Sequence, residues 1–253
     1  GLTVVKEVKK ILPKESIIYL GDTARVPYGT RSKKIVTEFS LQNIKFLLKK
    51  KVKCIVVACN TSSAQAFNNI KKESFVPTFD VISPGVIAAV ANGKVKKIGV
   101  IGTRGTIGSH AYKNKITKKN SKIKVFEVTC PLFVPLIEEG ELKGKLIEIL
   151  TETYLNSLKK VKVDTLILGC THYPLIKPEI AKQVGLKVRI VDSGKETARK
   201  LSEYLRTQKM LATNKRKPKE KYYVTDLTDR FVKVAEMFLG ESIAGKIRKI
   251  SLN

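Results

Sequence analysis

Short apolar runs alternate along the chain with segments whose apolar residues recur at helical spacing. This alternation is typical of α/β proteins, in which helices join the strands of a parallel sheet. The apolar runs predict strands at Ile17–Leu20, Cys54–Ala58, Val76–Ile82, Ile98–Ile101, Lys124–Val128, Thr165–Gly169, Val188–Val191 and Tyr222–Thr225. The helical spacing predicts helices at about Val4–Leu12, Ser32–Lys50, Ala64–Ile70, Leu142–Thr153 and Arg230–Leu239, and one more shortly after Thr106.

Two polar stretches divide this pattern. The strand-and-helix pattern restarts after Asn92–Lys97, and the lysine-rich stretch Thr207–Lys221 precedes the last strand and helix. A chain of 253 residues is long enough for two domains of about 100 to 150 residues each. Its longest apolar runs are far too short to span a bilayer. The first residues lack the apolar stretch of a signal peptide, so we expect a cytoplasmic protein.

The chain is strongly basic, with 49 basic and 22 acidic residues and a formal net charge of +27. Such a charge suggests either a nucleic-acid-binding protein or an enzyme with a lysine-rich surface. Lysine dominates and is spread over the whole length, and no basic motif alternates with aromatic residues as in an RNA-recognition sheet. The distribution therefore favours the lysine-rich surface over a nucleic-acid partner.

The cysteines and histidines limit the possible metal chemistry. Cys54, Cys59, Cys130 and Cys170 show no C-x-x-C spacing, so we expect neither a zinc ribbon nor another metal site. Without a secretory signal a disulfide framework is not expected either, which leaves four reduced thiols. We interpret Cys54, inside a predicted strand, and Cys130, before a proline, as structural.

Two of the cysteines directly follow predicted strands and precede small polar residues. Cys59 begins the sequence Cys59-Asn60-Thr61, and Cys170 begins Cys170-Thr171-His172. In open α/β sheets, ligands bind beyond the carboxyl ends of the strands. One cysteine in such a place is more often a small core residue, but two in matching positions favour a function. The free N–H groups at the start of a following helix favour a carboxylate ligand.

A thiolate and a thiol on opposite sides of a carbon acid can invert a stereocentre. One removes the proton from one face, and the other delivers a proton to the opposite face. The thiolate is the active base, so its pKa must be lowered by neighbouring donors. His172 could assist Cys170 as a proton partner or bind the ligand; its alternative interpretation is a loop residue with satisfied hydrogen bonds. His110 has no such neighbours and receives no role.

Four segments of the chain resemble the glutamate racemases, cofactor-independent enzymes that make D-glutamate for bacterial peptidoglycan. They are Gly21–Gly29 (GDTARVPYG), Ala58–Ser63 (ACNTSS), Gly169–Leu175 (GCTHYPL) and Val191–Ser193 (VDS). The resemblance implies two doubly wound α/β domains that face each other across the active site, with the C-terminal segment returning to the first domain. It divides the chain into residues 1–93 plus 208–253 and residues 94–207. It also implies glutamate as substrate, no cofactor and a homodimer.

The resemblance also implies a role for each matching residue. Cys59 would deprotonate D-glutamate, and Cys170 would deprotonate L-glutamate. The substrate would be held by Tyr28, Gly29, Asn60, Thr61, Thr171 and His172, in a pocket also lined by Pro27, Thr103 and Thr106. Glu138 matches an acidic residue that serves the second cysteine; its alternative interpretation is a solvated loop glutamate.

One departure from the family and three rival functions remain. The family begins with a strand that ends in Asp-Ser just before the Gly-Leu-Thr of residues 1–3. A chain that starts at Gly1 is therefore expected to be less stable, and poorly active in steps that use Cys59.

The nearest rival function is that of a racemase of a related amino acid such as aspartate, for which glutamate is expected in place of His172. The others are a DNA-binding protein with relic cysteines and a pyridoxal-phosphate enzyme, which needs a lysine that cannot be singled out.

Overall fold

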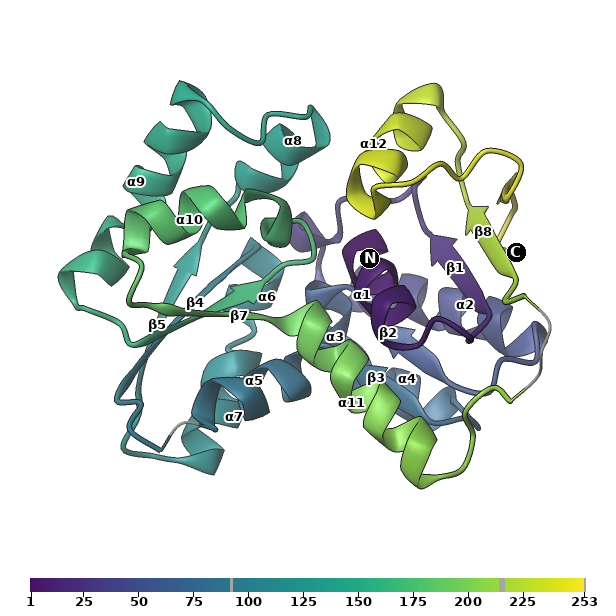
Figure 1. The fold of residues 1–253 in the computed structure, drawn as a ribbon, viewed down its shortest axis with the longest axis horizontal. Helices are drawn as coiled ribbons and strands as arrows, with labels where there is room; N and C mark the ends of the chain where they lie inside the picture. The colour runs from purple at the N-terminus through teal and green to yellow at the C-terminus, as the bar shows by residue number, and fades with distance from the viewer. Residues whose placement is uncertain (92, 214–216, 253) are drawn as a thin grey trace.

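The chain folds into two α/β domains, seen side by side in Figure 1. The structure, a computed structural model, describes residues 1–91, 93–213 and 217–252. Its elements in chain order are α1 (Leu2–Ile11), β1 (Ile17–Gly21), η1 (Tyr28–Thr30), α2 (Lys33–Lys49), β2 (Ile55–Val57), α3 (Asn60–Gln65), α4 (Phe67–Glu73), β3 (Thr78–Asp80), α5 (Ile82–Val90), β4 (Lys97–Gly102), α6 (Arg104–Gly108), α7 (Ala111–Lys119), β5 (Lys124–Thr129), α8 (Phe133–Glu138), α9 (Lys145–Lys160), β6 (Thr165–Gly169), η2 (Tyr173–Ile176), α10 (Lys177–Val184), β7 (Arg189–Asp192), α11 (Ser193–Thr207), β8 (Glu220–Val224), α12 (Asp229–Leu239) and β9 (Ile247–Lys249).

A four-stranded parallel sheet with the order β5-β4-β6-β7 forms the centre of one domain. Its two central strands are apolar on both faces, as strands covered by helices on both sides must be. Ile98 and Val100 of β4 pack with α5 and α7, whereas Ile101 packs with α9 on the other face. The register pairs Gly102 with Gly169, so β4 and β6 end side by side. The loops after these two strands therefore start at the same edge of the sheet.

The other domain contains two smaller parallel sheets, β1-β8-β9 and β2-β3. Strand β8 belongs to the C-terminal segment and pairs with β1 along its full length, from Ile17 opposite Glu220 to Gly21 opposite Val224. The prediction that the C-terminal segment returns to the first domain is confirmed. Phe238 of α12 shares an apolar cluster with the start of α1, which fixes the end of the segment against the beginning of the chain.

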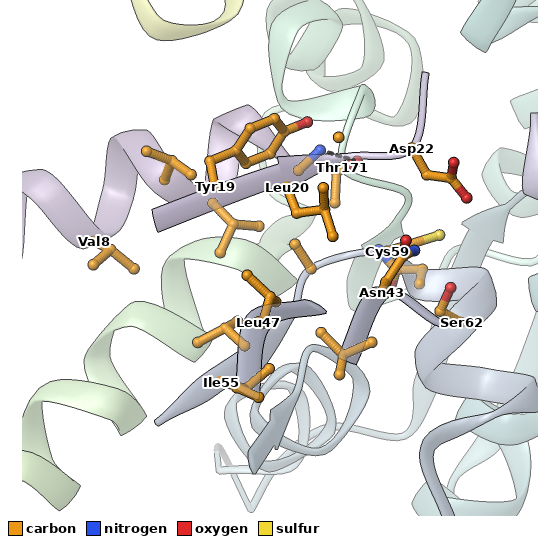
Figure 2. A pocket seen from close by; sticks show the side chains of 18 of the residues that line it. Val8, Tyr19, Leu20, Asp22, Asn43, Leu47, Ile55, Cys59, Ser62 and Thr171 are labelled. Carbon is orange, nitrogen blue, oxygen red and sulfur yellow. Dashed lines mark hydrogen bonds between the residues drawn. The ribbon is translucent and has the colours of Figure 1, made fainter. Parts of the chain in front are cut away.

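A cavity of about 1170 Å³ separates the two small sheets. Every residue of β1 and of β2 lines it, and Figure 2 shows the two strands on opposite sides of it. Each strand pairs only with a partner on its far side, β8 or β3, among the strands of the described residues. The edges of β1 and β2 that face the cavity are therefore open. Apolar side chains of α1, including Val4 and Val8, form a further part of the wall.

The structure differs from the predicted elements in the bounds of β3 and in several helices that the sequence pattern does not predict. The strand expected at Val76–Ile82 covers only Thr78–Asp80, because Ile82 already belongs to α5. Asp80 ends the strand: its Oδ1 accepts hydrogen bonds from the backbone N–H of Ile82 at 2.8 Å and of Ser83 at 2.6 Å. Helices α5, α8, α10 and α11 form where no helix is predicted, and α8 includes part of the proline-bounded loop expected at Cys130–Pro135. Asp192 starts α11 by accepting from the N–H groups of Gly194 and Lys195.

The division of the chain at residues 93/94 and 207/208 stays a prediction. Helix α5 precedes the first of these points, yet Ile82 and Val86 pack in the core of the four-stranded sheet. Helix α11 precedes the second, yet Ala198 and Leu201 pack against α1. These two helices therefore connect the domains. The two predicted boundary stretches include residues 92 and 214–216, which lie outside the described residues.

No helix in the described parts of the chain is long and apolar enough to cross a membrane. All four cysteines are free thiols. The cytoplasmic localisation and the homodimer stay predictions.

Candidate active site

The two strand-end cysteines lie on the wall of the same cavity. Cys59 follows β2 and occupies the N-cap position of α3, while Cys170 directly follows β6. The thiols thus come from different domains, each from the carboxyl end of a parallel strand. The other residues predicted for the site also line this cavity: Pro27, Tyr28, Gly29, Asn60, Thr61, Thr103, Thr106, Glu138, Thr171 and His172.

A chain of polar contacts leads from Cys170 to a carboxylate. The Cys170 Sγ lies 3.7 Å from His172 Nδ1, and His172 Nε2 lies 3.0 Å from Glu138 Oε1. The hydrogen bond with His172 holds the pKa of Glu138 below its ordinary value, so this group is a carboxylate at neutral pH. It accepts the Nε2 proton, which leaves the Nδ1 lone pair for the thiol. Glu138 is therefore a partner of His172 rather than a freely solvated loop residue.

The resting protonation states of this chain follow from burial. Burial raises the pKa of the Cys170 thiol to about 12, although a backbone hydrogen bond from His172 opposes it. Burial also lowers the pKa of His172, an effect that Glu138 only partly offsets. At neutral pH the site holds a Cys170 thiol next to a neutral imidazole. A thiol in this state can donate a proton, and transfer of its proton to His172 would leave a thiolate that can act as a base.

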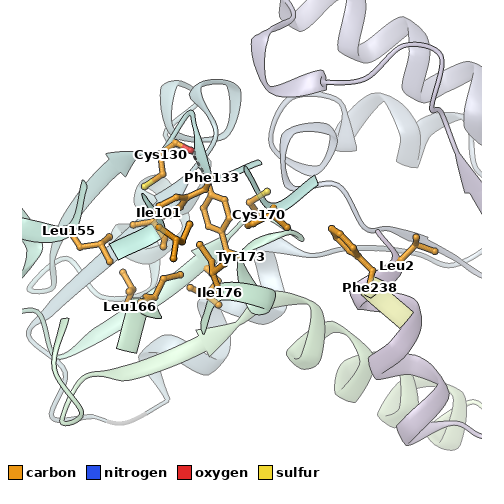
Figure 3. Packing of buried hydrophobic residues seen from close by; sticks show 14 of the residues in the cluster. Leu2, Ile101, Cys130, Phe133, Leu155, Leu166, Cys170, Tyr173, Ile176 and Phe238 are labelled. Atoms are coloured by element: carbon orange, nitrogen blue, oxygen red, sulfur yellow. Dashed lines mark hydrogen bonds between the residues drawn. The ribbon is translucent and has the colours of Figure 1, made fainter. Parts of the chain in front are cut away.

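The remaining apolar surroundings of Cys170 are shown in Figure 3, where Phe133 and Tyr173 pack beside it and Leu2 and Phe238 approach from the other domain. The Phe238 ring also stands edge-on to the His172 ring, with 5.1 Å between the centroids. The helical spacing predicts Phe238 on the buried face of its helix but not beside the site, because its place next to His172 depends on how α12 folds back.

Three threonine hydroxyls form a triangle where the domains meet. Thr61 Oγ1 on α3 lies 3.0 Å from Thr103 Oγ1 and 3.3 Å from Thr106 Oγ1, and the last two are 3.1 Å apart. Gly29 packs so closely on this triangle that a Cβ atom there would lie 2.7 Å from the Thr103 Cβ. Only glycine fits without displacing Thr103, which explains a glycine at this position.

Tyr112, which sequence analysis does not single out, orients the amide of Asn60. Both residues are buried, and the Tyr112 hydroxyl on α7 donates to Asn60 Oδ1 at 2.6 Å. Asn60 Nδ2 is buried and has no hydrogen-bond partner within residues 1–91, 93–213 and 217–252. An unpaired buried donor is costly, and an anionic oxygen in the cavity would satisfy it. Asn60 and Tyr112 are 52 residues apart, so no local pattern could link them.

The chain is similar to known racemases in both sequence and structure. The model of the Asp/Glu/Hydantoin racemase family matches residues 2–201. A curated glutamate racemase of Geobacter metallireducens is 44% identical over 252 residues, which cover 100% of this chain and 93% of that protein. One from Aquifex aeolicus is 42% identical, covering 98% of this chain and 93% of that protein.

Solved structures give the same result. The glutamate racemase of Francisella tularensis in complex with D-glutamate is 41% identical and superposes with a TM-score of 0.94, covering 100% of this chain and 94% of that chain. A glutamate racemase isoform from Bacillus anthracis is 38% identical with a TM-score of 0.95 and the same coverage. With a family match over most of its length and relatives above 40% identity, the chain belongs to the Asp/Glu/Hydantoin racemase family and is an enzyme of the racemase class.

Proposed function

We propose that this chain interconverts L-glutamate and D-glutamate by proton transfer between Cys59 and Cys170, without a cofactor, and so supplies D-glutamate for peptidoglycan. The observation that carries the proposal is two free thiols from opposite domains on the wall of one cavity. The glutamate racemases among its relatives support glutamate over aspartate as the substrate.

The reaction from D-glutamate uses the resting state of Cys170. The Cys59 thiolate removes the proton from the α-carbon, and the electron pair stays on that carbon. The Cys170 thiol then donates its proton to the opposite face, which yields L-glutamate with a Cys59 thiol and a Cys170 thiolate. In the reverse direction Cys170 must first lose its proton, and His172 Nδ1 lies in position to take it. Glu138 stabilises the imidazolium that forms.

Polar groups around the two thiols bind the substrate. The unpaired Asn60 Nδ2 donates to a substrate carboxylate, and the triangle of Thr61, Thr103 and Thr106 offers hydroxyls from both domains. Because these groups come from both domains, a bound substrate lies between the domains, with its α-carbon between the sulfur atoms.

Exchange of the α-proton tests the proposal. In heavy water, both glutamate enantiomers should gain deuterium at the α-carbon and racemise, whereas aspartate should react far more slowly. Nuclear magnetic resonance follows the exchange, and circular dichroism follows the racemisation. Faster reaction with aspartate would favour the rival racemase. Absence of exchange, combined with tight DNA binding at physiological salt, would overturn the proposal in favour of a DNA-binding protein.

Glu138→Gln is expected to slow racemisation by about 10²-fold, the usual scale of one assisting acid–base group. Glutamine keeps an oxygen for the Nε2 proton but cannot stabilise the imidazolium. The two enantiomers have equal free energies, so kcat/KM must fall equally in both directions. Loss of the carboxylate also lowers the pKa of His172 further, which moves the acid limb of the pH–rate profile to lower pH. An unchanged rate, or an acid limb at higher pH, would contradict this role.

Tyr112→Phe is expected to raise the KM for glutamate about tenfold with little change in kcat, because it removes an interaction that supports binding. The variant keeps the ring in the core but frees the Asn60 amide to rotate. Kinetics with each enantiomer measure the effect. Tyr154→Phe is the matched control: Tyr154 packs against Phe133 away from the cavity, and its variant should keep the normal KM. Equal KM values for both variants would exclude the orienting role.

A further inference from the structure

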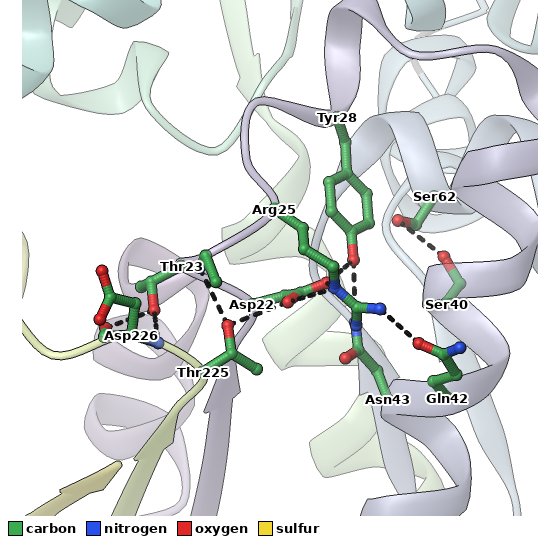
Figure 4. Close-up of polar contacts among 11 residues, drawn as sticks. Asp22, Thr23, Arg25, Tyr28, Ser40, Gln42, Asn43, Ser62, Thr225 and Asp226 are labelled. Atoms are coloured by element: carbon green, nitrogen blue, oxygen red, sulfur yellow. Dashed lines mark hydrogen bonds and ion pairs between the residues drawn. The ribbon is translucent and has the colours of Figure 1, made fainter. Parts of the chain in front are cut away.

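The loop that carries Tyr28 and Gly29 is held by a buried carboxylate, that of Asp22 (Figure 4). Arg25 Nε lies 2.8 Å from both carboxylate oxygens of Asp22. The Tyr28 hydroxyl donates to Oδ2, and the Thr225 hydroxyl donates to Oδ1 at 3.0 Å. The Asp22 side chain is therefore hydrogen-bonded to Arg25 and Tyr28 of the loop and to Thr225, which lies more than two hundred positions away in the sequence.

On one side this network is anchored to α2. The Arg25 guanidinium lies 4.0 Å above the centre of the Phe39 ring, and its Nη1 donates to Gln42 Oε1. Asn43 Nδ2 donates to the Tyr28 hydroxyl at 3.1 Å. Helix α2 begins just after the loop, so these contacts fold the loop back onto the helix that follows it.

On the other side the network is anchored to the turn after β8, in the returning C-terminal segment. The Ala24 N–H donates to Thr225 Oγ1 at 2.9 Å, and the Thr23 hydroxyl donates to the Asp226 carbonyl at 2.5 Å. The Asp226 N–H donates in turn to Thr23 Oγ1 at 2.7 Å. The C-terminal segment therefore reaches the loop through hydrogen bonds from two consecutive residues.

We propose that Asp22 and Thr225 are positioning residues of the active site, which act through Tyr28 to fix Gly29 against Thr103. This role rests on the proposed function, since Tyr28 and Gly29 are expected to bind glutamate. Gly29 packs so closely on Thr103 that there is no room for a Cβ atom at residue 29. The loop must hold Gly29 in this position, because small shifts of groups in an active site reduce activity. Apart from the turn η1 the loop has no regular structure, so these side chains set its position.

The Tyr28 hydroxyl and the Arg25 charge both favour a stable network around Asp22. Burial, reinforced by the Asp22 carboxylate, raises the pKa of Tyr28, so its hydroxyl stays a hydrogen-bond donor. Arg25 balances the carboxylate charge. The Tyr28 hydroxyl therefore keeps donating to Asp22 across the neutral range.

The test uses Thr225→Val, which removes one hydroxyl and keeps the shape of the side chain. Thr151→Val is the matched control: the Thr151 hydroxyl is also hydrogen-bonded, to backbone carbonyls, but Thr151 lies on α9 away from the cavity. Thr225→Val should raise the KM for glutamate about fivefold or more at nearly unchanged kcat, and the control should not. Asp22→Asn should act in the same direction and more strongly, if thermal melting shows that it folds.

A double-mutant cycle with Tyr28→Phe distinguishes positioning from general weakening. If Thr225 acts through the Tyr28 hydroxyl, adding Thr225→Val to Tyr28→Phe should change kcat/KM by less than about twofold. Fully additive effects would overturn the proposal, as would a normal KM in Thr225→Val.

Hydrogen–deuterium exchange gives a readout that does not depend on the substrate. The amides of residues 22–30 should exchange faster in Thr225→Val than in Thr151→Val or the unchanged protein. Equal exchange would overturn the positioning role even if the enzyme racemises glutamate. If the unchanged protein does not racemise glutamate, the proposed function fails, while the exchange comparison still decides whether the network holds the loop.

Discussion

Serine in place of either Cys59 or Cys170 is expected to reduce racemisation by at least about 10³-fold in both directions. A serine hydroxyl is a far weaker acid than a thiol, so it can neither form the base nor donate a proton at a useful rate. Cys54→Ser is the matched control, because Cys54 precedes β2 and packs with an apolar cluster beside the same strand. It should racemise glutamate at nearly the normal rate.

The proton exchange that remains should depend on the enantiomer. Cys170→Ser retains Cys59 as the base for D-glutamate, so the α-proton of D-glutamate should still exchange with heavy water while the configuration is kept. Cys59→Ser retains Cys170 and its His172–Glu138 chain, so L-glutamate should exchange instead. The same preference in both variants, or near-normal racemisation in either, would show that the two-thiol assignment is wrong.

The strands of the four-stranded sheet were the most predictable part of the fold. Residues 165–169 were expected as a strand and form β6, because a strand buried on both faces is a continuous apolar run. The sequence pattern does not predict α5, because Pro84 and Gly85 suggest a break, whereas proline is tolerated in the first turn of a helix. The pattern does not predict α11 either, because its buried residues, such as Ala198 and Leu201, are separated by many charged ones.

The candidate site likewise contains residues that the sequence predicts and residues that it does not. Residues within one short motif, such as Cys170 and His172, were found because the motif itself brings them together. Residues that act through partners far away in the sequence are not found in this way. Asp22 stands in one of the recognised motifs, but its bond to Thr225 joins residues 203 positions apart. Such a contact depends on the return of the C-terminal segment to β1, which sequence periodicity does not specify.

A strand added ahead of Gly1 is expected to fill the gap between β1 and β2. The Gly1 nitrogen lies 3.3 Å from Thr171 Oγ1, so residues joined there begin inside the cavity, at the carboxyl ends of the strands. A segment that runs back from this point is parallel to β1 and β2. It can form ladder bonds with both open edges, and its side chains replace empty space beside Val8 and Ile55.

The expected gain is large because the gap is apolar and both of its edges are unpaired. Each valine or isoleucine buried there contributes roughly 2 kcal/mol before the cost of ordering the chain. A net gain of 1 kcal/mol raises the Tm of a protein of this size by about 2 to 4 °C. An extension of about a dozen residues holds one strand of typical length and its turn. It should therefore raise the Tm by several degrees.

Activity should rise with stability if the extension ends in Asp-Ser, as the resemblance to glutamate racemases implies, because the aspartate then stands near Cys59. Three fusions to Gly1 separate the effects: an apolar strand ending in Asp-Ser, the same strand ending in Asn-Ser, and a Gly/Ser segment of equal length. The first should raise both Tm and the racemisation rate, the second mainly Tm, and the third neither. Equal melting temperatures and rates for all three and for the 253-residue chain would show that the gap needs no strand and that Cys59 needs no aspartate.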